Sequence, residues 1–249
     1  MKNQASRHSS PQSGSVLFMV FIMIGLFAAL SFTLSQGMRS GTSQLTDNQA
    51  MLAATEMIEY GQKIQQAIKG LMIGNGCADS EISFWYDDNG DGAENSSDLY
   101  YNANAPASKK CHLFRPEGGG LYFATPPNNS YSPVSGLVSY DHAITQKYFF
   151  DGRRPIMGVG TDAVNTGNDV TLRLQVTQNV CQQINNAFGI TNIPLDNWPY
   201  FEFPNNINNT AGQAVLDCGG SCTGQRSMCF LQTGGPNQAY QFYYTVLVR

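Results

Sequence analysis

The stretch VLFMVFIMIGLFAALSFTL, residues 16–34, contains no charged side chain and only two hydroxyl side chains. At about 1.5 Å per residue, a helix over this stretch is roughly 28 Å long, close to the roughly 30 Å of a bilayer hydrocarbon core. Lys2 and Arg7 precede it, and Arg39 is the basic residue that follows it closely. This bias predicts a single membrane-spanning helix with a cytoplasmic N-terminus.

A cleaved secretory signal is the alternative interpretation of this stretch. Ala28, Ala29 and Ser31 are small residues of the kind that a signal peptidase accepts. The apolar run is longer than the usual signal core of about 7–15 residues, however, and no turn signal follows it. We therefore favour a retained helix.

The helical pattern continues beyond the apolar stretch. Across residues 43–72, apolar or small residues recur at steps of three and four, which is the spacing of one helix face. Gly37 and Gly41 lie at the junction, where the helix could bend, and Gly70, Gly74 and Gly76 mark its end. The sequence predicts one helix over residues 15–72, with a second half that packs against a head. The stripe comprises Met51, Ala54, Ile58, Gly61, Ile64, Ile68 and Leu71.

All six cysteines follow the apolar stretch. An even number on one side of a membrane segment is typical of disulfides in an oxidising compartment. A metal cluster at Cys218, Cys222 and Cys229 is the alternative, but no histidine lies near these three. We expect disulfides, with the pairing left open. The six are Cys77, Cys111, Cys181, Cys218, Cys222 and Cys229.

The head, residues 73–249, reads as α+β, with an antiparallel sheet. Its composition favours strands at 81–86, 120–124, 169–176 and 239–248, and a hairpin between 228–232 and the last strand. A helix is expected over 178–188, with Cys181 beside its apolar face and linked to the C-terminal cysteines. Residues 125–133 and 203–212 are expected to be surface loops. The aromatic stretch 197–203 favours core packing over a binding patch.

Residues 87–98, DDNGDGAENSSD, match the pattern D-x-N-x-D-G of calcium loops. Calcium takes about six to eight oxygen ligands, and alternate positions of a tight loop converge on one point. Gly92 permits the sharp turn. An acidic, solvated hairpin turn is the alternative, because Asn-Gly and Asp-Gly are common turn pairs. The expected ligands are Asp87, Asn89, Asp91, the carbonyl of Ala93, Asn95 and Asp98, where Asp is shorter than the usual Glu.

Residues 12–18, QSGSVLF, resemble the processing site of type IV pilins and type II secretion pseudopilins. The resemblance is specific over residues 12–72 and architectural beyond. It implies that residues 1–14 are a cytoplasmic leader, that a prepilin peptidase cuts after Gly14, and that Ser15 becomes the methylated N-terminus. It further implies a single-pass inner-membrane anchor that becomes a filament core, and a periplasmic or extracellular head. Other pilin or pseudopilin subunits would be its partners.

The fifth position of the mature chain is Met19, where most members of that family have Glu. A lone carboxylate in lipid is costly unless it is paired with a neighbouring subunit. A subunit at the tip of a filament has no neighbour above it and can do without the carboxylate. Met19 therefore indicates either a tip-type subunit or a divergent relative that does not polymerise.

No catalytic constellation stands out in the sequence, and we predict no enzyme. His8, His112 and His142 are isolated, and the adjacent Ser, Asp and His of residues 139–142 do not make a triad. The glycines of 118–120 and 158–160 favour turns over phosphate loops. The net charge of −4, without a basic stripe, argues against nucleic acid.

The sequence favours a minor pilin or pseudopilin with a calcium-binding head. The alternative is a bitopic envelope protein with a calcium-stabilised binding head and an uncleaved anchor. A membrane-tethered hydrolase is a third and weaker hypothesis.

Overall fold

The structure is a computed structural model that describes residues 14–131, 147–152, 154–161, 169–197, 207, 215–234 and 238–249. In the N-terminal helix it describes the backbone but not the side chains of residues 14–19, 21 and 26–45. The chain divides into two compact units, Met1–Asn48 and Gln49–Arg249. The helix, sheet and disulfides described below place the head in the predicted α+β class.

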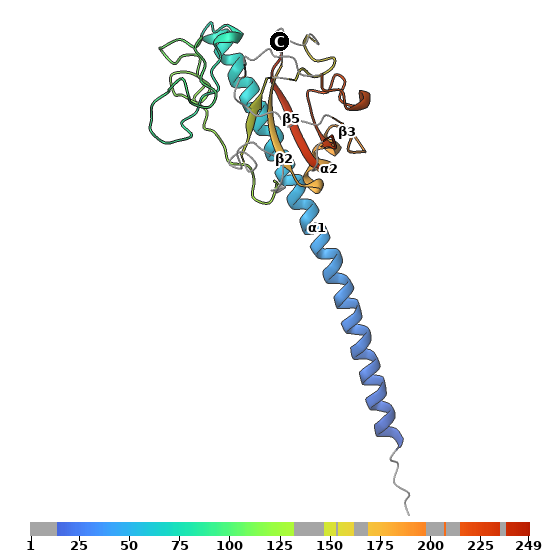
Figure 1. Cartoon of the computed structure of the whole chain (residues 1–249). Coiled ribbons are helices and arrows are strands. Elements are labelled where there is room, and N and C mark those ends of the chain that lie inside the picture. The colour runs from blue at the N-terminus through green and yellow to red at the C-terminus, as the bar shows by residue number, and fades with distance from the viewer. Residues whose placement is uncertain are drawn as a thin grey trace, which may run out of the picture. The chain divides into compact units, whose positions relative to one another are not determined.

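Helix α1 spans Gly14–Gly74, 61 residues, so the predicted single helix is confirmed (Figure 1). The helical backbone continues through Gly37 and Gly41, where a bend was considered. At the C-terminal end, the Asn75 and Cys77 N–H groups donate to the Leu71 carbonyl at 3.1 and 3.2 Å. Gly76, with φ of 65°, takes the left-handed conformation that ends a helix in this way.

The membrane segment predicted over residues 16–34 lies largely outside the described side chains, and the leader, 1–13, lies outside the described residues. Within the part of the chain that the structure describes, no helix is both apolar enough and long enough to cross a membrane.

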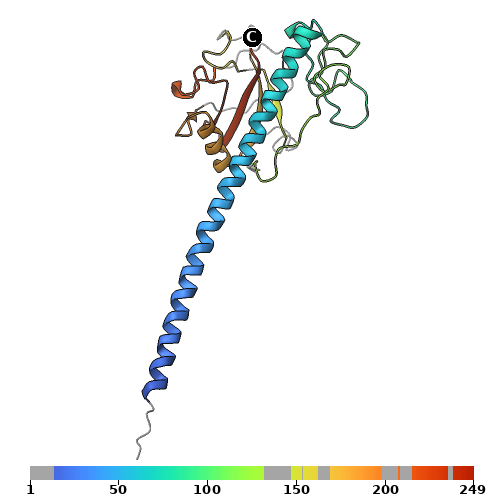
Figure 2. The same ribbon diagram turned by 180° about the vertical axis from the view of Figure 1, so that it is seen from behind.

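Within the second unit, the C-terminal part of α1 packs on a sheet, and both views place it along β2 and β5 (Figures 1 and 2). The predicted stripe is buried except at its start, where Met51 is 55% exposed. The buried face begins instead at Ala50 and Ala53, one position before Met51 and two after it, so inclusion of Met51 in the stripe was wrong. The other buried positions are Ala54, Met57, Ile58, Gly61, Ile64, Ile68 and Leu71.

The sheet has five strands in the order β1-β2-β5-β4-β3. β3 pairs parallel with β4, while the remaining pairs are antiparallel, so the sheet is mixed and the prediction of an antiparallel sheet was wrong for this edge. A long connection separates β3 from β4, and a parallel pair requires such a connection. The strands are β1 Phe149–Asp151, β2 Val170–Val176, β3 Leu195–Asp196, β4 Ser227–Gln232 and β5 Ala239–Leu247.

The two strands predicted at 169–176 and 239–248 are confirmed as β2 and β5, and β4 forms the predicted hairpin with β5. The predictions at 81–86 and 120–124 were wrong. In the first segment, the 3₁₀ helix η1, Asp79–Glu81, ends at residue 81, and Ser83 makes an isolated bridge to His112. Residues 120–124 are irregular. Phe84, Tyr86 and Phe123 of these segments pack in a cluster instead, and β-propensity reports such packing as much as strand formation. In this cluster Tyr86 stacks on Phe123 with ring centroids 3.8 Å apart.

Helix α2, Gln178–Ala187, confirms the helix predicted at 178–188. The Thr177 hydroxyl accepts from the Val180 N–H and caps it. Cys181 is bonded to Cys229 of β4, so the expected link to the C-terminal cysteines is present. The side chain of Asn185 adds two 2.8 Å hydrogen bonds to the backbone of Cys229.

All six cysteines are paired, which excludes the metal cluster considered for the last three. The other disulfides are Cys77–Cys111 and Cys218–Cys222, the second within the 3₁₀ segment η2, Cys218–Gly220, and the turn that follows it.

The two faces of the sheet differ in chemistry. Alternate residues of β2 and β5, such as Leu174 and Phe242, belong to the apolar core that α1 completes. The opposite face is also buried but carries two ion pairs, Arg173–Asp151 at 2.9 Å and Arg154–Asp196 at 2.7 Å. Buried charges are tolerated because each is paired.

We predict that Gly61→Ala destabilises the head. A Cβ at Gly61 would lie 2.5 Å from Cγ of Tyr244, at the root of the ring, so the ring or the helix must shift. Such overpacking costs about 1–3 kcal/mol. Gly70→Ala is the matched control, because it meets no atom within 4 Å and should gain up to about 1 kcal/mol of helix propensity. Chemical denaturation measures both, and equal effects of the two changes would contradict the close contact.

Candidate functional site

The predicted calcium loop, residues 87–98, begins where the chain leaves the core after Trp85 and Tyr86. Most of its residues are exposed, and Gly90 and Gly92 have φ of 76° and 73°. These left-handed glycines turn the backbone twice within three residues, as the sequence pattern predicts for Gly92. The loop is therefore a tight turn at the surface.

The first three predicted ligands fold back onto this turn. The two carboxylate oxygens of Asp87 accept from the N–H groups of Gly90, at 2.8 Å, and Gly92, at 3.0 Å. The side-chain oxygen of Asn89 accepts from the Asp91 N–H at 3.0 Å. Asp91 Oδ1 accepts from the Ala93 N–H at 2.8 Å. Each of these oxygens has a second lone pair, so it can still bind a cation while it accepts from its N–H donor.

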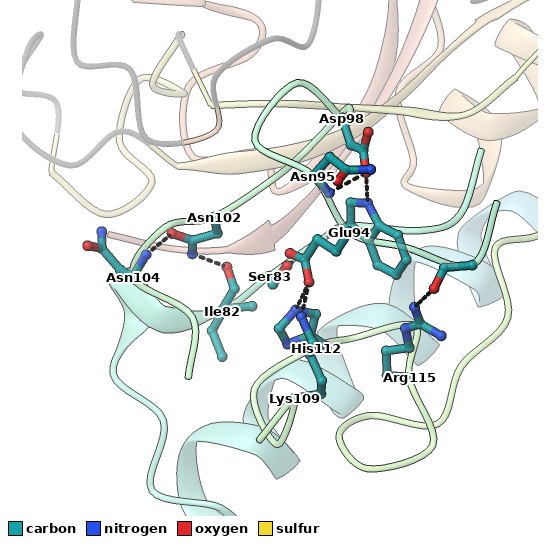
Figure 3. Close-up of polar contacts among 12 residues, drawn as sticks. Ile82, Ser83, Glu94, Asn95, Asp98, Asn102, Asn104, Lys109, His112 and Arg115 are labelled. Atoms are coloured by element: carbon teal, nitrogen blue, oxygen red, sulfur yellow. Dashed lines mark hydrogen bonds and ion pairs between the residues drawn. The ribbon is translucent and has the colours of Figure 1, made fainter. Parts of the chain in front are cut away.

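The last predicted ligand, Asp98, is held at the inner end of the loop. Its Oδ2 atom accepts from the Asn95 N–H at 2.7 Å and from the Trp85 indole N–H at 3.1 Å (Figure 3). The loop is thus closed by a hydrogen bond to a buried tryptophan. Asn95 contributes its backbone to this closure.

The donors fit a hard cation in kind, since they are carboxylate, amide and carbonyl oxygens. Among the described residues, however, no three His, Cys, Asp or Glu side chains are close enough to hold a metal ion. The carboxylates are turned onto the N–H groups of the loop, and enclosing an ion would require them to turn toward one point. The structure brings Asp87, Asn89 and Asp91 onto one turn and directs Asp98 to Trp85.

Sequence reasoning missed Glu94, the eighth residue of the loop. Its side chain is only 5% exposed and points inward, to His112 and Lys109 (Figure 3). The carboxylate lies 2.9 Å from His112 Nε2 and also pairs with the Lys109 ammonium. His112, which looked isolated in the sequence, is therefore part of a polar cluster with the buried Glu94 and the partly exposed Lys109. No spacing in the sequence connects these residues.

The segment that carries Lys109 and His112 is fixed to the rest of the head. Cys111 is bonded to Cys77, just beyond the end of α1. The Ser83 N–H donates to the Cys111 carbonyl at 3.0 Å, and the Leu113 N–H donates to the Ser83 carbonyl at 2.9 Å. We call this segment, residues 109–115, the floor of the loop.

Arg115 adds a second contact between the floor and the loop. Its guanidinium lies over the Trp85 ring, 4.4 Å from the centroid, and donates to the Gly92 carbonyl at 3.4 Å. Gly118 and Gly119 lie in the turns expected for them. Glycine is required at both positions, because a Cβ there would meet the backbone of His112 or Leu113.

The chain before the loop is held by Asn102. Its amide nitrogen donates to the Ser80 carbonyl at 2.9 Å. The same nitrogen donates to the Ile82 carbonyl at 3.0 Å, and the amide oxygen accepts from the Asn104 N–H at 3.0 Å (Figure 3). Asn102 is buried, so these bonds satisfy polar groups that water does not reach.

Burial lowers the pKa of His112 below its usual 6.5, although the hydrogen bond and charge of Glu94 act in the opposite direction. The positive charges of Lys109 and Arg115 lower it further. His112 Nδ1 has no hydrogen-bond partner within the described ranges. We infer a neutral imidazole whose Nε2–H donates to Glu94, because a second N–H at Nδ1 would be buried and unpaired.

The remaining predicted positions are Gly14, the first residue of α1, and Ser15, the second. His8, His142 and most of the aromatic stretch 197–203 lie outside the described residues.

Comparisons of the chain with protein-family models, with curated proteins and with solved structures gave no match.

We predict that His112 makes the head less stable at mildly acidic pH. Because the pKa of His112 is lower in the folded chain than the 6.5 of an exposed histidine, the unfolded chain binds the proton more readily. The stability that neutral His112 provides is fully present above about pH 6.5 and is lost as the pH falls toward the pKa of His112 in the folded chain. In buffer that contains a chelator, so that no metal ion contributes, the free energy of unfolding should fall more steeply from about pH 7 to about pH 5 in the parent than in His112→Gln. Parallel pH profiles of the two proteins would contradict this.

Proposed function

We propose that this chain is a minor pilin or pseudopilin, a structural subunit of a type IV pilus or a type II secretion-like filament. In this proposal residues 16–34 anchor the chain in the inner membrane, with the N-terminus cytoplasmic and the head periplasmic or extracellular. A prepilin peptidase removes residues 1–14. The subunit assembles with other pilin or pseudopilin subunits and catalyses no reaction.

The observation that carries the proposal is the construction around α1. One helix runs from Gly14, the first described residue, to Gly74, and its residues 49–74 provide a face of the core of a disulfide-bonded head. In this proposal, force on residues 14–48 passes along the continuous helix to residues 49–74 and from there to the sheet. This is the mechanical requirement of a filament subunit.

The chemistry of the N-terminal sequence supports the same function. An apolar stretch without charge requires lipid or other apolar helices around it, and a filament core supplies such helices after extraction from the membrane. Met19 in place of a carboxylate fits a subunit at the tip, where no neighbouring N-terminal ammonium is available as a partner.

We also propose that residues 87–98 bind one calcium ion that stabilises the head. Asp87, Asn89 and Asp91, with the Ala93 carbonyl, would hold the ion from the turn, and Asn95 and Asp98 would complete the ligands. When bound, the ion supplies positive charge that offsets the repulsion among these carboxylates. The exposure of the turn and its all-oxygen donors support this.

Processing predicts the N-terminus of the mature protein. We expect intact-mass and N-terminal peptide analysis of the membrane fraction to find a chain that begins at Ser15 and is N-methylated. Cells without the prepilin peptidase are the control and should retain Met1. A chain that begins at Met1 in cells with active peptidase would instead support the bitopic envelope protein with an uncleaved anchor.

Calcium binding predicts a chelator-sensitive melting temperature. At a calcium concentration of 100 times Kd, binding should stabilise the fold by about 2.7 kcal/mol, and a chelator should remove that amount. Asp87→Ala with Asp91→Ala should abolish the chelator effect. Glu56→Ala with Glu59→Ala removes two exposed carboxylates from α1 and should leave it unchanged. If the Asp87 and Asp91 variant keeps its chelator response, the ion binds elsewhere.

A further inference from the structure

Glu94 differs from its neighbours in the loop. Ala93 and Asn95 on either side are exposed and are proposed ligands, whereas the Glu94 side chain is turned to the opposite side and is 5% exposed. Glu94 is the eighth residue of the loop, a position that does not supply a ligand in calcium loops of this pattern, so its carboxylate is available for another contact. Here its carboxylate faces the interior, away from the exposed turn (Figure 3).

The contacts of Glu94 bind the middle of the loop to the floor. The carboxylate pairs with the Lys109 ammonium and lies 2.9 Å from Nε2 of His112, whose side chain is 1% exposed. Withdrawing Glu94 would leave a buried imidazole N–H and a partly buried ammonium without their acceptor. Because the His112 N–H is buried, it would find no water in place of the carboxylate, so the contact resists opening.

The floor itself is fixed at two points. Cys111 joins it to Cys77 by a disulfide. Lys110 and Asn75 exchange two hydrogen bonds, from Asn75 Nδ2 to the Lys110 carbonyl at 2.7 Å and from Lys110 Nζ to the Asn75 carbonyl at 2.9 Å. Glu94 is therefore attached to a segment that is tied to the end of α1.

The backbone at Lys109 supports a special role for this contact. Lys109 has φ of 60°, a left-handed conformation that is unfavourable for a non-glycine residue. Such conformations persist where surrounding contacts determine them, and they cluster at ligand sites. At Lys109 this conformation accompanies an ammonium that faces Glu94.

We propose that Glu94 is the positioning residue of the calcium loop. It is not a ligand; through Lys109 and His112 it holds the adjacent Ala93 carbonyl and Asn95 in place on the exposed side. An ion then meets a loop whose centre is already ordered, which reduces the entropy lost on binding. This inference rests on the proposed calcium function.

The test is calcium affinity, measured by titration calorimetry on the full chain well below its melting temperature. Groups that orient metal ligands typically change affinity by about 10- to 100-fold, so Glu94→Gln should weaken binding by that factor. Glu94→Asp keeps the charge but is too short to keep both contacts, and it should weaken binding similarly. Asp88→Asn removes an exposed charge from the loop itself, keeps Glu94, and should change affinity by less than about fivefold.

Lys109→Met separates positioning from simple electrostatics by the sign of its effect. Removing a positive charge near a cation site should tighten calcium binding if charge alone acts. If Glu94 positions the loop through Lys109, the same change should weaken binding. Lys69→Met is the control: it removes an exposed lysine of α1 that makes none of the contacts above, and it should leave affinity unchanged. Lys109→Met also serves as the second variant if a change at Glu94 prevents folding.

The outcomes separate the two proposals. If the parent chain binds no calcium, the calcium function fails and this inference falls with it. If the parent binds calcium but Glu94→Asp and Lys109→Met bind as tightly or more tightly, the positioning role alone is overturned. Weaker binding in both variants, with the parent's one-ion stoichiometry, supports it.

Discussion

The contact between Gly61 of α1 and the ring of Tyr244 on β5 sets the distance at which the helix lies on the sheet. Because glycine has no Cβ, the aromatic ring lies directly against the helix backbone. The flanking Met57, Ile58, Ile64 and Ile68 can then pack with the apolar face of β2 and β5. The face of the sheet that α1 covers is thus closed by residues 49–74 of that helix, and the stability of the head depends on them.

A second level of organisation lies between the end of α1 and residue 131. This region contains no strand among its described residues, and it is held by the Cys77–Cys111 disulfide, by stacked aromatic rings and by the Glu94–His112–Lys109 cluster. Figure 1 shows it on one side of α1, with α2 and β3 on the other. An irregular backbone with an ordered interior suits an exposed loop that presents oxygen ligands, because the chain need not follow a strand.

Much of the fold could be predicted because its signals are local. The helix of α1, the strands β2 and β5 and the helix α2 follow from periodicity and turn residues within each segment. The segments 81–86 and 120–124 have the composition of strands, but the aromatic side chains of Phe84, Tyr86 and Phe123 pack in one cluster. Composition reports that a residue will be buried, not the partner against which it packs. The parallel pairing of β3 failed for the same reason, since it depends on the path of a long connection.

The sequence by itself determined that a long helix carries a disulfide-bonded α+β head and that residues 87–98 form a tight acidic turn. These features depend on spacing, glycine and cysteine content, which act over a few residues or through their number. Only the tertiary structure decided which cysteines pair, which residues face the sheet, and that Glu94 turns inward to meet His112 and Lys109. Those outcomes depend on groups brought together from distant parts of the chain, where burial makes an unpaired charge too costly and so selects its partners.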